Sequence, residues 1–285
     1  MTAWTSGDGP TPGEAARALA DHPWLDRVAR LGIIASGLLH LVLGWLAARV
    51  ALGTGNEEAV DHGSALAVIR DGPFGQYLLW ACVIGFGALA LVRLLEGTLG
   101  GTSLAARGRS LSKAGLYVVL GVMAVRVALG GRLEGEGAAT NFTESLLSAP
   151  WGRALVGLLA GIILGVGIYH VHKGFARRFT KDLRVAGYPV VGQGMTVLGT
   201  IGYVTKGVAL IVVGGLFTLA AWSGDAGEAG GLDGAIDALS DTGTGTSLLL
   251  VISVGLVLYG IYTFARARYE RFSPAGPSPV AERTT

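Results

Sequence analysis

Long apolar segments alternate with short polar ones along the chain, and this pattern predicts six membrane-spanning helices. A helix that crosses the hydrocarbon core needs about 20 residues, and six segments approach or exceed that length. The alternation typical of β-strands is absent, so helices rather than a barrel are expected. The six segments are roughly Leu31 to Leu52, Gln76 to Leu99, Ser112 to Leu129, Arg153 to His172, Met195 to Trp222 and Ser247 to Ala265.

The first two apolar segments and the connector between them form a unit that recurs twice. A shift of 77 residues places Gly44 on Gly121 and Pro73-Phe74-Gly75 on Pro150-Trp151-Gly152, and a shift of 170 places Gly44 on Gly214, without gaps. Because each unit holds two helices, every unit enters the membrane with the same sense, and such parallel repeats are related by an axis along the membrane normal. We therefore expect an all-α polytopic membrane protein with three tandem two-helix repeats around a pseudo-threefold axis.

The chain is predicted to consist of three repeat units, preceded and followed by a polar terminal segment. The region 1–21 is polar, rich in Gly, Pro and Ala, and lacks the apolar core of a signal peptide. Trp24 to Arg30 is expected to be an interfacial segment. The predicted organisation is a disordered segment 1–23, repeats at 24–105, 106–191 and 192–272, and a disordered tail 273–285.

The basic residues predict how the chain is oriented. Of the 22 Lys and Arg residues, 16 fall near the N-terminus, the second and fourth loops and the C-terminal tail. Cytoplasmic loops carry an excess of such residues, so both termini are expected in the cytoplasm. Arginine outnumbers lysine 18 to 4, as in GC-rich bacterial genomes, which favours a bacterial plasma membrane. The outer connectors are acidic and hold amphipathic stretches that are expected on the membrane surface or as caps on the bundle: Gly63 to Arg70, Asn141 to Ser148 and Leu232 to Ser240.

Composition agrees with a membrane protein. The chain is 51% hydrophobic and 15% charged, whereas soluble domains are about 25% charged. The net charge of +2 is too small to indicate a nucleic-acid partner. The single cysteine, Cys82, permits no disulfide within the chain.

Several motifs recur in register and resemble a known family. They include Arg30-Leu31-Gly32, Pro73-Phe74-Gly75, Pro150-Trp151-Gly152-Arg153, Gly167-Ile168-Tyr169, Phe179, Gly202-Tyr203-Val204, Lys206-Gly207 and Gly231-Leu232-Asp233. The chain resembles the DUF1206 family, a triplicated two-helix membrane repeat of unknown function, over nearly all of residues 24–272. The resemblance implies a fold but no activity. The chain departs from the pattern at Arg109 and Ala114, where the other two units have glycine, and at Leu219, where they have arginine.

Polar residues at equivalent positions predict a ring near one end of the helices. Arg93, His170 and Thr263 align between units, as do Glu96, Lys173 and Arg266, and Ser36, Lys113 and Lys206. Glu96 is the only acid of this ring and could pair with Lys113 or Lys206, because an isolated charge at depth costs about 2.5–3.5 kcal/mol. The ring is either a gate or anion-binding site at a cytoplasmic vestibule, or a set of side chains that snorkel to the interface. The candidate polar ring comprises Arg93, Glu96, Lys113, His170, Lys173, Lys206 and Arg266.

Three glycines four residues apart predict close helix packing. Gly157, Gly161 and Gly165 form a ridge on one helix, and such a ridge lets another helix approach closely in lipid. Packing within the chain is favoured, with a dimer contact as the alternative.

No motif indicates catalysis or a cofactor. The chain has no P-loop, no H-E-x-x-H, no C-x-x-C and no G-x-S-x-G. His40 and His170 could in principle ligate haem, but their equivalents in the other units are not histidine and their depths differ, so neither metal nor cofactor is expected. The sequence favours a non-enzymatic membrane scaffold or partner-binding protein. The alternative is a small-solute or ion transporter or channel with its path along the inter-repeat axis. Besides the lipid bilayer, a membrane-protein partner or a homo-oligomer is compatible with the sequence.

Overall fold

The chain is a bundle of long α-helices. The computed structural model describes residues 22–54, 60–99, 103–131, 138–182, 189–229, 234–236, 239 and 243–269. These residues form α-helices and short 3-10 turns without any strand, which confirms the all-α class. The predicted disordered tail 273–285, most of the segment 1–23 and part of the third amphipathic connector lie outside the described residues.

Six of the helices are long and apolar enough to cross a membrane, as the sequence predicts. The segment Trp24 to Arg30, expected to be interfacial, forms the first turns of the first helix, which begins at Pro23 because proline suits a first turn. The six are α2 (Pro23–Ala51), α4 (Gly75–Leu99), α5 (Leu104–Ala128), α7 (Gly152–Phe175), α8 (Pro189–Ser223) and α10 (Gly243–Tyr269).

Shorter elements occupy the connectors. They are α3 (His62–Asp71), α6 (Ala138–Leu147), η1 (Arg178–Asp182) and η2 (Ala226–Glu228). Asp61 caps α3 by accepting from the Ser64 backbone N–H at 2.7 Å, while the Ser64 hydroxyl accepts from the Asp61 N–H at 3.0 Å. The apolar face of α3 is buried against α2, α4 and α5, so this amphipathic stretch caps the bundle.

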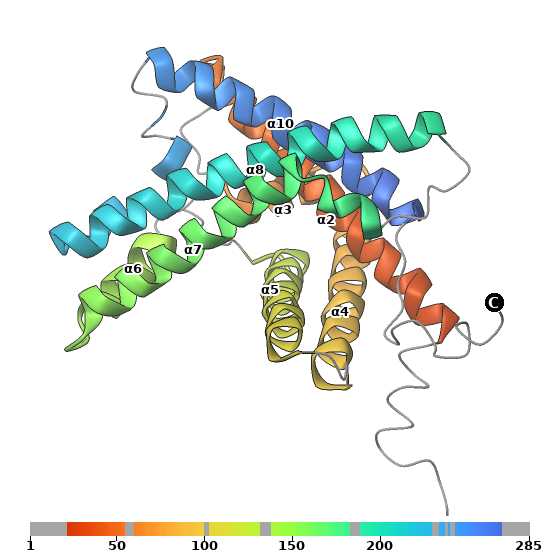
Figure 1. Cartoon of the computed structure of the whole chain (residues 1–285), viewed down its shortest axis with the longest axis horizontal. Coiled ribbons are helices and arrows are strands. Elements are labelled where there is room, and N and C mark those ends of the chain that lie inside the picture. Colours follow the sequence, from red (N-terminus) through yellow and green to blue (C-terminus); the bar gives the residue numbers. More distant parts are fainter. Residues whose placement is uncertain are drawn as a thin grey trace, which may run out of the picture.

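The long helices pack in chain order, with one exception. Between units, α4 packs on α5, α7 on α8, and α10 on α2. Within units, α2 packs on α4 and α8 on α10, but α5 and α7 of the second unit make no comparably extensive contact among the described residues. In Figure 1, α7 runs beside α8, whereas α5 runs beside α4 in a different direction. The pseudo-threefold arrangement is therefore not confirmed.

Two missing glycines give the physical reason for this exception. Where α2 meets α4, a side chain on Gly85 would lie 2.6 Å from the Cα of Gly32, so the two backbones touch. The equivalent glycines of the third unit also lie at the contact of α8 with α10, but not against each other: Gly202 lies against Tyr259 and Gly255 against the side chain of Thr205. The second unit has Arg109 and Ile162 at these two positions, and neither side chain permits backbones to approach.

The unpacked faces leave α5 and α7 unusually exposed. In the most apolar stretch of each helix, 28% of α5 and 17% of α7 is buried, against 39% to 50% in the other four long helices. We call the space bordered by these unpacked faces the open side. It borders only the second unit, and the other units are closed by their glycine contacts.

The largest core lies among α2, α3, α4, α5 and α10. It is built from leucine, phenylalanine and small aliphatic side chains, including Leu43, Leu66, Leu79, Phe86 and Leu249, each at most 2% exposed. This core runs along nearly the whole length of α2, from Leu25 to Ala47, and α3 closes it at one end.

Candidate functional site

The residues of the candidate polar ring interact with one another across several helices. Lys113 on α5 interacts electrostatically with Arg93 and Glu96 on α4, with Lys173 on α7 and with Arg266 on α10. His170 on α7 interacts with Lys206 on α8. We call the set the basic cluster: Arg93, Glu96, Lys113, His170, Lys173, Lys206 and Arg266.

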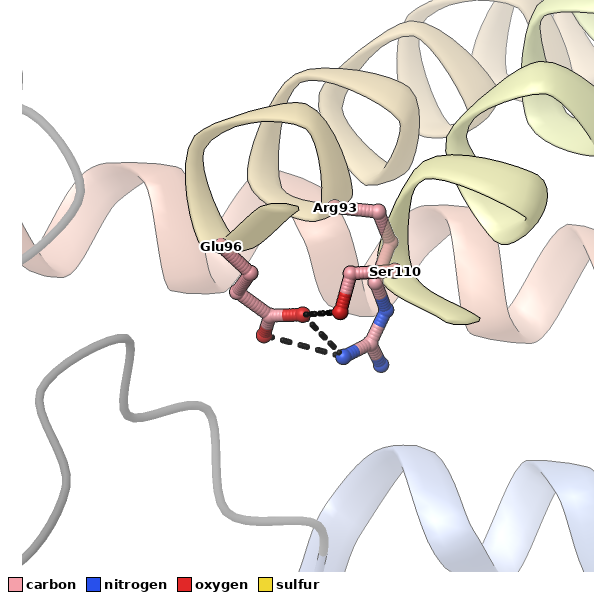
Figure 2. A network of polar contacts seen from close by, with 3 residues as sticks. All are labelled: Arg93, Glu96 and Ser110. Carbon is pink, nitrogen blue, oxygen red and sulfur yellow. Dashed lines mark hydrogen bonds and ion pairs between the residues drawn. The ribbon is translucent and has the colours of Figure 1, made fainter. Parts of the chain in front are cut away.

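Glu96 pairs with a cation on its own helix rather than across the ring. Nη1 of Arg93 donates to both carboxylate oxygens of Glu96, at 2.9 and 2.8 Å, and the Ser110 hydroxyl donates to Oε2 at 3.4 Å (Figure 2). The two side chains are only 12% and 18% exposed. The predicted pairing with Lys113 or Lys206 is not among the ion pairs of the described residues, where Arg93, three positions away on the same helix face, holds the carboxylate.

Lys206 lies deep in the bundle, and its ammonium contacts two aromatic side chains. Its Nζ donates to Nε2 of His40 at 2.9 Å and lies 4.8 Å from the centre of the Tyr259 ring. Nδ1 of His40 donates to the Ser36 carbonyl at 2.6 Å, since a carbonyl can only accept. His40 is therefore neutral where Lys206 is charged. The sequence left His40 without a role, although both residues lie midway along their spans.

An aromatic wall surrounds the cations. Tyr203 packs against Tyr259 with ring centres 5.3 Å apart, and Nζ of Lys173 lies 4.8 Å above the Tyr203 ring. Phe179 of η1 stacks on Tyr203 at 5.2 Å and meets Tyr262 edge-on at 5.5 Å. Cation–π contacts of this kind stabilise an ammonium that has left water. Sequence reasoning missed these tyrosines, because aromatic residues at helical spacing are more often simple core residues.

His62 connects the cap to the deep end of the basic cluster. It begins α3, and it interacts electrostatically with Lys206 and His40. Burial, followed by the nearby Lys206 ammonium, lowers the pKa of His62 to about 4, while Asp61 opposes the shift. His62 is therefore a neutral imidazole at pH 7.

The arrangement gives no support to a metal centre. Within the described part of the chain, no three His, Cys, Asp or Glu side chains are grouped so that they could hold a metal ion. His170 resembles His40 in donating from Nδ1 to the carbonyl four residues earlier, at 2.8 Å. The Nε2 of His40 is already engaged by Lys206.

The glycine ridge of α7 does not pack within the described chain. Gly161 and Gly165 have no atom within 4 Å of the position a side chain would take, and Gly157 is near only Ala221 at 3.8 Å. The expected packing of this ridge within the chain is not seen among the described residues. On another face of α7, Gly167 lies at the contact with α8, where a side-chain carbon would lie 3.0 Å from the carbonyl oxygen of Gly207.

Comparison with known proteins agrees with this architecture. The family described as Domain of Unknown Function (DUF1206) matches residues 31–100, 110–177 and 201–270, so the chain belongs to this family. A relative in Bacillus subtilis (strain 168), described as the uncharacterized protein YxxB, is 27% identical over 264 residues, covering 88% of this chain and 93% of the relative. No solved structure matches the chain. The chain is thus a multi-pass member of a membrane family to which no activity is attached.

Proposed function

We propose that the protein is a non-enzymatic membrane scaffold that associates with a second copy of itself through the glycine ridge of α7. The observation that carries this proposal is that the ridge Gly157, Gly161 and Gly165 is not covered by another described helix. At Gly161 and Gly165, no atom lies within 4 Å of the position that a side chain would take. Several other glycines of the spans, such as Gly32, Gly44 and Gly207, are used for close helix contacts, whereas the ridge is a row of small residues that no described helix covers. Small residues at such spacing let helices associate in lipid, where apolar burial gives no driving force.

A second copy suits this surface better than a charged partner. Between Arg153 and His170 the sequence of α7 carries no charge, and the neighbouring Leu158 and Ile162 are 63% and 55% exposed. A two-fold contact places the same patch on both partners, so an uncharged ridge is complementary to itself. The ridge lies in the half of α7 away from the basic cluster, which leaves that cluster accessible in a dimer.

The oligomeric state in lipid tests this proposal. We expect the full-length protein, labelled once per chain in lipid nanodiscs or vesicles, to bleach in two steps at densities where Gly161→Leu bleaches in one. Gly87→Leu is the matched control, because Gly87 on α4 is equally bare and faces away from neighbouring helices. A single bleaching step for the wild type at every density, or equal behaviour of the two variants, would refute self-association through the ridge.

Transport of a small solute or ion is the alternative function, and one feature favours it. The basic cluster reaches from one end of the bundle to Lys206 near its middle. However, a core of leucine and phenylalanine side chains runs along the described part of the bundle, and α3 caps one end of it. A closely packed core of this kind supports a scaffold more than a path for passage.

We further propose that the protein lies in a bacterial plasma membrane with both termini and the basic cluster on the cytoplasmic side. The excess of Lys and Arg at that end supports this orientation. The relative in Bacillus subtilis supports a bacterial membrane. Labelling of single cysteines introduced into a Cys82→Ser background tests it, with cysteines beyond Tyr269 expected to be inaccessible from outside the cell.

A further inference from the structure

We propose that the hydrogen bond between Lys206 and His40 is a proton-controlled latch: it holds α8 to α2 while the His40 ring is neutral, and it opens when that ring takes up a second proton. The inference does not depend on self-association, because neither side chain belongs to the glycine ridge of α7. The position of the contact, its proton count and its surroundings each support it.

The latch joins two helices that make little other contact. Nζ of Lys206 lies 2.9 Å from Nε2 of His40, and the two residues are 166 positions apart in the chain. Helices α2 and α8 each pack on α10, but among the described residues they do not pack extensively on each other. His40 is only 6% exposed. A change at this one buried hydrogen bond therefore acts on the junction between the first and third units.

The two nitrogens of the His40 ring have different roles. Nδ1 lies 2.6 Å from the Ser36 carbonyl oxygen, which can only accept, so Nδ1 carries the ring proton. Nε2 then accepts from Lys206, because an ammonium has three donors and no acceptor. A second ring proton would sit on Nε2, where it makes both partners donors and brings two positive charges together. Loss of a proton from Lys206 has no such effect, since a neutral amine still donates, so the latch responds to acid and not to base.

The groups that surround His40 in the described structure include no carboxylate that could offset a second proton. Tyr259 of α10 meets the His40 ring edge-on, with ring centres 4.8 Å apart, and Nζ of Lys206 lies 4.8 Å from the centre of the same tyrosine ring. His62 of α3 is the other titratable group that interacts electrostatically with His40, and α4 contributes none. Like charges repel strongly in a medium of low dielectric constant. The repulsion is therefore relieved by separation of the two side chains.

Neighbouring contacts indicate which partner moves. Helix α2 is held on α10 by backbone contacts, because a side chain on Gly44 would lie 2.8 Å from the Ser253 carbonyl oxygen. Lys206 is only partly buried, and its stem of four carbons is flexible. Release therefore moves Lys206 away from His40 and loosens α8 against α2, while α2 stays on α10. Shifts of packed helices by about 1–2 Å are enough to switch an interface.

The test follows the latch in the full-length protein in lipid while the pH is lowered from 8 to 4. Solid-state NMR with ¹⁵N-labelled histidine and lysine side chains reports the protonation of each ring nitrogen and any short contact between two nitrogens. The His40 signal is the one that is absent from His40→Gln. At pH 8 we expect a ring protonated on Nδ1 and in contact with Nζ of Lys206. On acidification, we expect the second ring proton to appear and this contact to be lost together, in a protein that is still folded.

Spin labels show whether the helices respond. Labels at Ile34 of α2 and Ile201 of α8, both exposed, report the distance between these helices in a Cys82→Ser background. Over the pH range in which His40 takes up its second proton, the mean distance is expected to lengthen by about 1–2 Å and its distribution to broaden. An unchanged distribution would overturn the inference.

Three single variants separate the latch from other titrating groups. His40→Gln keeps an oxygen that accepts from Lys206 but takes up no proton, and Lys206→Met removes the ammonium, so both are expected to lose the pH-dependent change in distance. His62→Gln is the matched control and is expected to keep it, because it removes the other nearby histidine and leaves the latch in place. The inference is overturned if His40→Gln responds to pH as the wild type does.

The wild type alone also decides the question if a variant does not fold. The inference is overturned if His40 gains its second proton while the contact with Lys206 persists. It is equally overturned if His40 stays neutral down to pH 4, or becomes charged only when the whole protein unfolds.

Discussion

The contact between Gly32 and Gly85 allows a direct test of how closely the two helices of the first unit, α2 and α4, pack together. In Gly85→Ala, the new methyl group would lie 2.6 Å from the Cα of Gly32, well inside ordinary van der Waals contact. Its other neighbours are also backbone atoms, which cannot rotate away. The two helices must therefore separate locally, which loosens the packing of buried Leu89 nearby.

The expected magnitude comes from the cost of overpacking. Extra methyl groups in a packed core cost about 1–3 kcal/mol, whereas alanine in place of glycine favours the helix itself by about 1 kcal/mol. Gly87→Ala on the same helix separates these effects, because Gly87 has nothing within 4 Å. The difference between the two variants therefore isolates packing and should be about 1–3 kcal/mol, or roughly 2–12 °C in Tm.

Thermal unfolding in detergent, followed by intrinsic tryptophan fluorescence, measures this difference. We expect Gly85→Ala to unfold at a lower temperature than Gly87→Ala, with Gly87→Ala at or slightly above the wild type. Equal Tm values for the two variants would refute the reasoning, because the backbones of α2 and α4 would then not touch at these glycines.

Two further predictions concern charged and titrating groups. Glu96→Gln is expected to lower the free energy of unfolding by about 1–3 kcal/mol, because it removes the carboxylate that faces the Arg93 guanidinium at a site only 12% exposed. Asp71→Asn, the control, breaks the more exposed pair with Arg70 and should cost no more than about 1 kcal/mol. Equal losses of Tm in the two variants would contradict this reasoning. The pKa of His62 is lowered to about 4, whereas an unfolded histidine has a pKa near 6.5, so the unfolded chain takes up a proton between pH 6.5 and 4 that the folded chain does not. Stability should therefore fall as pH falls through this window, and His62→Gln should reduce the fall in Tm while His22→Gln, at an exposed position, should not.

The sequence predicted the six spans and their threefold repetition because both depend on local patterns. Apolar length determines a span, and glycines at fixed offsets recur in every unit. Convergence of Lys113, Lys173 and Arg266 was also predictable, since equivalent positions of a repeat lie at similar depth. The family match divides the chain at similar positions, with segments at 31–100, 110–177 and 201–270.

Contacts that depend on which helices are neighbours could not be predicted in the same way. The pair of Lys206 with His40 joins α8 to α2, which requires both helices to pack on α10. The partner of Glu96 was available from the sequence as Arg93, three residues earlier, but the symmetric ring drew attention to other helices. Glycines spaced four residues apart are common where helices pack, and only the structure reveals that no other described helix covers this ridge of α7.

The opening of the second unit was partly visible in the sequence. Arg109 stands out where the other units have Gly32 and Gly202. The second substitution, Ile162, gains its meaning only once Gly85 is found in contact with Gly32, and Gly202 and Gly255 at the contact of α8 with α10. A side chain at either position prevents a backbone contact of this kind, because even a methyl group on Gly85 would meet the backbone of Gly32.

The distance between α5 and α7 tests most directly whether the second unit differs from the other two. Spin labels at Val119 and Leu158, both exposed, report on this pair in a Cys82→Ser background, and labels at the equivalent positions Val42 and Ala81 report on the closed pair α2 and α4. We expect the distribution for α5 and α7 in lipid to be centred at a longer distance than that for α2 and α4. Coinciding distributions would contradict an open second unit.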